Sequence, residues 1–198
     1  LLMLKTQIAS FLILISIFIT PLEAKEPSKL ITEIVNEASM ILSSSDPVES
    51  KIIKLNNIAE TNVDIDGIGM YTLGKYRKIL SEDQKIKYNK LFKSYFLKSF
   101  SSRLVDYSNP KINVVSKKKL NEKYTIVNTV LEETSKNPKI KIDWRIYTKN
   151  PERPLIRDLI VEGLSLARTQ KEEFNSIIQN NNGDINFLFK SLEEFIIK

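Results

Sequence analysis

Residues 139–148 read KIKIDWRIYT, and their alternation is the strongest indication of the fold class of the chain. Ile140, Ile142, Trp144 and Ile146 alternate with charged or polar residues, so a β-strand here places all four on one face. The same alternation predicts three further strands, at 111–118, 123–133 and 155–162. Polar turns separate the four segments, which indicates an antiparallel meander with one apolar face.

Helical periodicity precedes and follows these strands. The clearest helix begins at Ser81-Glu82-Asp83-Gln84, a capping box in which the Ser and Gln side chains satisfy free N–H groups reciprocally, and it runs to about Tyr107. Other helices are predicted at 28–43, 47–59, 64–74, 166–179 and 184–197. This order predicts an α+β fold in which helices cover one side of a curved, four-stranded antiparallel sheet. The predicted shape is a cone like that of cystatin-like and nuclear-transport-factor-like folds, with Trp144 facing the long aromatic helix.

The first 24 residues have the pattern of an export signal. Lys5 precedes the uncharged stretch IASFLILISIFIT at 8–20, and Pro21 and Ala24 follow it. This order is typical of a secretory signal, and the apolar stretch is short for a membrane span, although a retained anchor is the alternative. We therefore predict a signal peptide at 1–24, cleaved after about Ala24, and a single domain at 25–198. Export without any Cys favours the periplasm over a disulfide-stapled extracellular fold.

The composition excludes much familiar chemistry. The 198 residues contain 30 Lys and Arg, 24 Asp and Glu, and no His or Cys, with a net charge of +6. Without imidazole or thiol groups, the usual zinc sites, Ser-His-Asp triads and Cys nucleophiles cannot form. We expect no catalytic residue, no metal and no cofactor. The alternatives are an exported enzyme with Asp143 or Glu162 as base on a small apolar substrate, or an interaction domain without a ligand.

Several ordered motifs resemble those of one family. They are NVDID at 62–66, LGKY at 73–76, SEDQ at 81–84, LFKSY at 91–95, SRLVDYS at 102–108, IDWRI at 142–146 and RDLIVEGLSL at 157–166, with Phe174 after them. In this order they resemble the MlaC family of periplasmic phospholipid-binding proteins, also called toluene-tolerance auxiliary proteins. Departures from the family pattern occur at Arg77, at 151–154 and at 169–171.

The resemblance implies a carrier with an open interior that holds acyl chains. Pattern alone favours the opposite reading, in which the aromatic residues fill a solid core. At about 0.8 kcal/mol per CH₂, two long chains exposed to water cost on the order of 25 kcal/mol, so a lipid that crosses an aqueous gap needs an apolar container. The implied cargo is glycerophospholipid. The implied partners are an outer-membrane lipoprotein complex and an inner-membrane ABC transporter subunit, between which lipid moves to maintain outer-membrane asymmetry.

Given an open interior, the predicted faces identify candidate residues. The expected tail-lining residues lie on the long helix and three strands: Leu91, Tyr95, Phe96, Ile126, Val130, Ile142, Trp144, Ile146, Leu159 and Val161. The segment Glu162-Gly163-Leu164-Ser165 is expected at the mouth, because Gly163 permits a sharp turn there. Leu164 is a candidate contact for a docking partner, or else it caps the core. We expect a monomer and no nucleic-acid partner.

Overall fold

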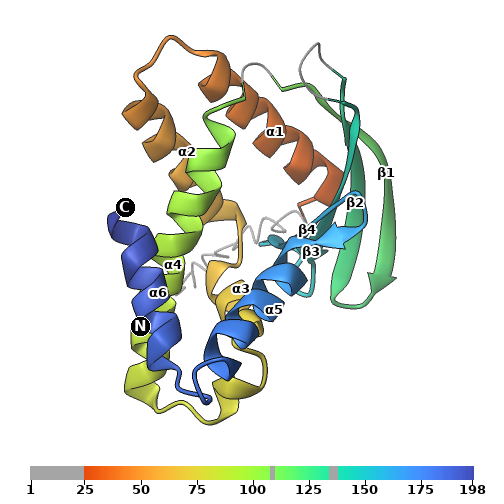
Figure 1. Ribbon diagram of the computed structural model, residues 1–198. Helices are drawn as coiled ribbons and strands as arrows, with labels where there is room; N and C mark the ends of the chain where they lie inside the picture. The colour runs from red at the N-terminus through yellow and green to blue at the C-terminus, as the bar shows by residue number, and fades with distance from the viewer. Residues whose placement is uncertain (1–24, 108–109, 134–137) are drawn as a thin grey trace, which may run out of the picture.

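The computed structural model describes residues 25–107, 110–133 and 138–198 and has α+β architecture (Figure 1). The predicted signal peptide, 1–24, lies outside the described residues. The elements before the sheet are α1 (Pro27–Ser43), α2 (Val48–Asn62), α3 (Ile65–Thr72), the 3-10 helix η1 (Gly74–Lys78) and α4 (Glu82–Leu104). The strands are β1 (Ile112–Asn121), β2 (Tyr124–Leu131), β3 (Ile140–Tyr147), β4 (Leu155–Val161) and β5 (Leu164–Ser165). Helices α5 (Leu166–Gln179) and α6 (Asn186–Ile197) complete the chain, and none of the described helices could span a membrane.

The long helix α4 begins where the capping box predicts. The Gln84 backbone N–H donates to Ser81 Oγ at 3.2 Å, and the Ser81 N–H donates to Gln84 Oε1 at 3.0 Å. Ser165 caps α5 in the same way, because its hydroxyl accepts from the Arg168 N–H at 3.1 Å. Local side-chain chemistry therefore fixes where these two helices start.

The sheet is antiparallel throughout, in the order β1-β2-β3-β4-β5. The α+β prediction is confirmed, but the predicted four-stranded sheet has a fifth strand of two residues. Glu162 and Gly163 make the turn from β4 into β5 with φ of 48° and 83°. Positive φ at both positions is typical of a tight hairpin turn. The sequence does not reveal β5 because two residues carry no detectable alternation.

The apolar interior is divided into two clusters. One joins α1 to the sheet and contains Leu30, Ile31, Ile34, Val35, Ile58, Val127, Ile146 and Ile156. The other lies among the remaining helices and contains Tyr88 and Phe92 of α4 together with Phe174, Leu188 and Phe189. The sheet is thus covered by α1 and not by the long helix α4, so Trp144 packs on the α1 cluster, contrary to our expectation.

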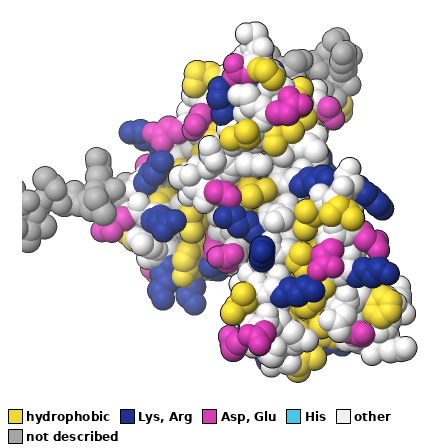
Figure 2. Space-filling model, turned by 90° about the vertical axis from the view of Figure 1, so that its left-hand side faces the viewer, with side chains coloured by type: hydrophobic (Ala, Val, Ile, Leu, Met, Phe, Trp, Pro, Cys, Tyr) yellow, Lys and Arg dark blue, Asp and Glu magenta, His cyan; other side chains and the backbone are white. Residues whose placement is uncertain are grey.

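The helix α4 does not cover the sheet because α3 and α6 pack against its aromatic face. Gly69 of α3 lies so close that a Cβ atom built there would be 2.7 Å from Phe92 Cδ1. Rings of α4 also pack against α6, where the Tyr95 and Phe195 centroids are 4.9 Å apart. On the face of the molecule shown in Figure 2, hydrophobic side chains are scattered among charged ones of both signs.

The α2–α3 junction ties the two clusters together at the edge of β4. Val63 packs against both clusters and forms a parallel bridge with Ile156. The next residue, Asp64, donates its N–H to the Ile156 carbonyl at 2.9 Å and accepts from the Gly67 N–H at 3.0 Å through its side chain. Its carboxylate also pairs with Arg157 Nε. This junction holds the helical half against the sheet half.

Candidate functional site

The sheet register shows which apolar residues share a face. Val127, Trp144 and Leu159 are consecutive cross-strand partners on β2, β3 and β4. The next row contains Ile142 and Val161, and it reaches Leu164 on β5. Because directly opposed residues point to the same side, both rows lie on the face that α1 covers.

Helix α1 covers this face only in part. Near its N-terminal end, the Lys25 N–H donates to the Pro151 carbonyl in the β3–β4 turn, at 2.9 Å. Near its C-terminal end, Ser39 Oγ donates to the Pro110 carbonyl just before β1, also at 2.9 Å. The helix thus crosses the sheet diagonally and leaves free the corner where β3 begins and β4 ends.

An apolar row occupies that uncovered corner. Ile142 and Val161 are half-buried and belong to neither apolar cluster, and Leu164 is 58% exposed. We call Ile142, Val161 and Leu164 the open row. By contrast, Ile146, four residues along β3 and under α1, is fully buried. Exposure of the apolar face therefore rises along β3 away from α1.

Helix α4 presents half-buried aromatic residues at the same end of the sheet. Phe96 and Phe100 stack with centroids 6.0 Å apart and rings 7° from parallel, and both are half-buried. The chain passes from this end of α4 to the start of β1 (Figure 1). Ala38 and Ile41, near the end of α1, are half-buried as well. Apolar side chains that are not fully packed thus come from α1, α4 and the sheet, which makes this region the candidate tail-binding surface.

The structure divides the predicted lining residues of α4, β3 and β4 among three places. Ile142 and Val161 lie in the open row, whereas Trp144 and Leu159 pack against the α1 cluster and Ile146 is buried in it. Leu91, Tyr95 and Phe96 pack against the helical cluster. The Tyr95 hydroxyl donates to Gln170 Oε1 at 2.7 Å, and burial raises the pKa of Tyr95.

Two predicted residues of β2 require a correction. Ile126 and Val130 are the partners of Arg145 and Lys141, so they lie on the opposite face from Ile142. They cannot share one cavity with the open row, whereas their neighbours Val127 and Thr129 are on its face. The faces of β2 cannot be distinguished by hydropathy, because Thr125, Ile126 and Val127 are all buried. A strand buried on both sides shows no alternation.

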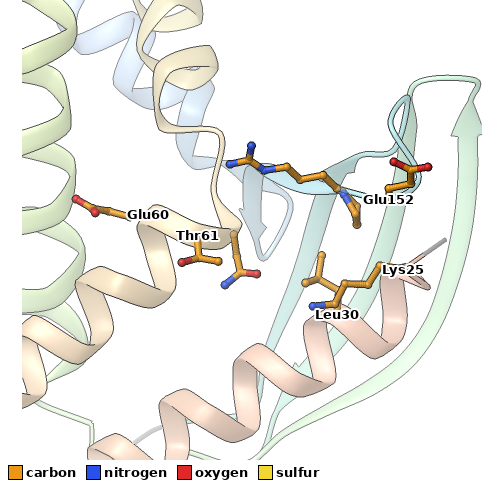
Figure 3. A pocket seen from close by; sticks show the side chains of 8 residues that line it. Lys25, Leu30, Glu60, Thr61 and Glu152 are labelled. Atoms are coloured by element: carbon orange, nitrogen blue, oxygen red, sulfur yellow. The ribbon is translucent and has the colours of Figure 1, made fainter. Parts of the chain in front are cut away.

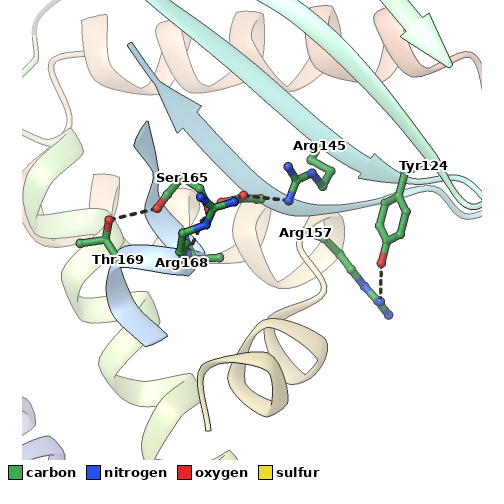
Figure 4. A network of polar contacts seen from close by, with 8 residues as sticks. Tyr124, Arg145, Arg157, Ser165, Arg168 and Thr169 are labelled. Atoms are coloured by element: carbon green, nitrogen blue, oxygen red, sulfur yellow. Dashed lines mark hydrogen bonds and ion pairs between the residues drawn. The ribbon is translucent and has the colours of Figure 1, made fainter. Parts of the chain in front are cut away.

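The opposite face of β3 and β4 carries a polar network that fixes the start of α5 (Figure 4). Asp158 is buried and accepts from Ser165 Oγ at 2.6 Å, the Ala167 N–H at 3.0 Å and Arg145 Nη1 at 3.3 Å. Arg157 lies over the Tyr147 ring at 4.2 Å. These contacts are structural, because a buried carboxylate with three donors is fully occupied.

The two carboxylates considered as general bases also have structural partners. Asp143 accepts from Asn128 Nδ2 at 2.7 Å, and Glu162 accepts from the Lys141 N–H. Within the described residues, no group of three or more acidic side chains is placed to hold a metal ion. Asp143 thus links β3 to β2, and Glu162 links the end of β4 to the start of β3.

The predicted mouth segment divides into anchored and free parts. Ser165 is buried and bonded to Asp158, so its side chain is not available to a partner. Gly163 has open space around it, and a Cβ atom built there meets nothing within 4 Å. Leu164 projects beside it, in line with the open row.

Two clefts on the described part of the chain lie away from the open row, and neither is lined by a predicted tail-binding residue. The first, about 440 Å³, lies between α1, the end of α2 and the β3–β4 turn (Figure 3). Its lining is largely polar: Lys25, Leu30, Glu60, Thr61, Asn62, Glu152, Arg153 and Pro154. The second, about 370 Å³, is lined by Tyr71, Gly74, Lys75, Arg77, Lys78 and Lys171.

Comparisons with known proteins identify relatives of the whole fold. The sequence model of the MlaC protein family matches residues 29–194. The structure resembles that of a phospholipid-binding protein from Ralstonia solanacearum solved in complex with a phospholipid, with a TM-score of 0.72 and 16% sequence identity. The match covers 87% of this chain and 98% of that one. No curated protein matches the sequence.

Proposed function

Because the chain belongs to the MlaC family, we propose that it binds phospholipid and carries it through water with the acyl chains shielded. The observation that carries this proposal is the open row, which leaves apolar side chains of the sheet uncovered by α1. A phospholipid bound to a protein of the same fold supports it. The half-buried surfaces of α4 and α1 at this end of the sheet supply the remaining walls.

The carrier role needs burial and no bond chemistry. Each methylene group removed from water contributes about 0.8 kcal/mol, so an apolar surface alone retains a lipid tail. The charged head group then stays outside, near the mouth at Leu164. We therefore propose a binding and transport protein, not an enzyme.

The proposed setting is the periplasm, reached through the signal peptide at 1–24. By family membership, the proposed partners are an outer-membrane lipoprotein complex and the lipid-binding subunit of an inner-membrane ABC transporter. The proposed process moves mislocalised glycerophospholipid between these two complexes and so maintains outer-membrane asymmetry. Release then requires a partner that widens the site, because strongly bound tails do not leave rapidly on their own.

Organic extraction followed by mass spectrometry tests the proposal directly. The chain is expressed with its signal, purified from the periplasmic fraction without detergent and extracted. We expect co-purifying phospholipid at a reproducible ratio to protein. Its consistent absence from folded protein, together with no uptake from phospholipid vesicles, contradicts the proposal.

A further inference from the structure

The second cleft is rimmed by positive charge. Its 370 Å³ are lined by three basic side chains of η1 and one of α5, together with Tyr71 and Gly74. The basic residues are Lys75, Arg77, Lys78 and Lys171. We call these four residues the basic cleft.

The local backbone brings these charges together. Gly74 adopts φ of +56° and turns the chain out of α3 into η1. In a 3-10 helix, residues three apart lie on one side, which places Lys75 and Lys78 together. Lys171 crosses from α5 directly over the glycine, because a Cβ atom at Gly74 would be 3.0 Å from Lys171 Cε. Any other residue at 74 would be strained at this positive φ and would push the flexible end of Lys171 aside.

Aromatic rings, and not carboxylates, hold two of these cations. Lys171 Nζ is 5.2 Å from the centre of the Tyr71 ring, and Lys75 Nζ is 5.3 Å from that of Tyr76. Among the described residues, none of the four has a carboxylate oxygen within 4 Å. This contrasts with the lysines of α4, three of which pair with Glu82, Glu193 and Glu60.

A concave surface lined by basic side chains without carboxylate partners favours the binding of an anion. Cations this close repel one another, and an anionic group between them relieves the repulsion. On the face shown in Figure 2, acidic and basic side chains are intermixed, whereas the basic cleft has one sign only. A recessed site suits side chains that protrude from a partner better than it suits a flat bilayer surface.

We propose that the basic cleft is the docking site for an acidic segment of a partner protein. The partner's carboxylates enter the cleft, and its apolar side chains meet Tyr71 and Ile79, which are 40% and 74% exposed. Lys171 is about 8 Å along α5 from the first residue of that helix, Leu166, at 1.5 Å per residue, and the mouth residue Leu164 lies two residues before the helix. A partner seated here therefore reaches the mouth. This inference rests on the proposed carrier function, which requires a partner that takes the cargo.

A labelled acidic peptide tests the docking site. The probe is fluorescein-labelled hexaglutamate, and binding is followed by fluorescence anisotropy in low salt. The test variant is Lys75→Glu with Lys171→Glu. The matched control is Lys118→Glu with Lys149→Glu, which changes the net charge equally at two exposed positions outside the cleft. We expect at least about a tenfold loss of affinity for the test variant and less than about twofold for the control.

Equal losses in both variants overturn the proposal, because binding then follows net charge and not the cleft. Tighter binding of inorganic pyrophosphate, or binding to vesicles with phosphatidylglycerol but not to the peptide, also overturns it in favour of phosphate or a membrane. Should the charge reversal impair folding by circular dichroism, Lys75→Gln with Lys171→Gln replaces it, with a loss of about threefold expected.

Phospholipid extraction of the same samples separates the two proposals. We expect the cleft variant to retain its lipid, since the cleft lies outside the open row. Lipid-free wild-type protein that still binds the peptide through the cleft contradicts the carrier function alone. Lipid-loaded wild-type protein that binds no peptide contradicts the docking site alone.

Discussion

Replacing Ile142 with Trp should obstruct the open row from within. Ile142 is half-buried between its cross-strand partners Thr129 and Val161. An indole offers roughly 100 Å² more apolar surface than the isoleucine it replaces, which corresponds to about three methylene groups at ~25 cal/mol per Å². Displacing three methylenes of the tail costs ~2.4 kcal/mol, or about fiftyfold in lipid affinity. Val161→Trp acts on the same row and should have a similar effect.

The assay is titration with a fluorescent phospholipid, combined with lipid phosphorus per mole of purified protein. Val130→Trp is the matched control, because Val130 is a half-buried residue of the adjacent strand that points to the opposite face. We expect Val130→Trp to leave affinity within about twofold of wild type. If Ile142→Trp folds and binds lipid normally, or if Val130→Trp weakens binding equally, the tails do not lie on the open row.

Three further substitutions test the framework around the site, each by urea unfolding. Asp158→Ala leaves three donors without their buried acceptor and should lower the free energy of unfolding by about 3 kcal/mol. A change below about 1 kcal/mol would show that water replaces the carboxylate as the acceptor. Asp64→Ala removes the α3 cap and the main tie between the two halves, for a loss of about 2 kcal/mol, whereas exposed Asp66→Ala should cost less than about 0.5 kcal/mol. Gly69→Ala drives a methyl group into Phe92 and should destabilise by about 1–3 kcal/mol despite the better helix propensity of alanine, so a stabilised variant would contradict the close contact of α3 and α4.

The sequence predicts the elements well because their signals are local. The capping box at Ser81 and Gln84 and the alternation in 139–148 each depend on neighbours a few residues away, and the structure confirms both. The strand β5 escapes notice because its two residues pair only after the turn at Gly163 has formed. Local sequence signals thus predict the longer elements, whereas the two-residue strand β5 depends on its pairing with β4 in the folded chain.

The candidate site is harder to predict because it depends on long-range pairing. Both α1 and α4 have apolar faces, and nothing local decides which one covers the sheet. Helices α3 and α6 pack against the apolar face of α4, so α1 is the helix that packs on Ile146 and the sheet. The face of Val130 likewise depends on its partner Lys141 across the sheet. Residues on the strongly alternating strand β3 are placed correctly relative to one another, and those on doubly buried β2 are not.

Because the apolar interior is divided into two clusters, the fold is complete without the open row. Each cluster contains fully buried residues, such as Ile146 beneath α1 and Tyr88 among the helices. Neither cluster needs the open row, so the fold does not depend on a ligand to complete its core. A tail that occupies the corner buries apolar surface that would otherwise face water beside the short strand β5, where exposed edges promote association. Loading therefore adds stability to an existing fold, and unloading returns the protein to that fold without unfolding it.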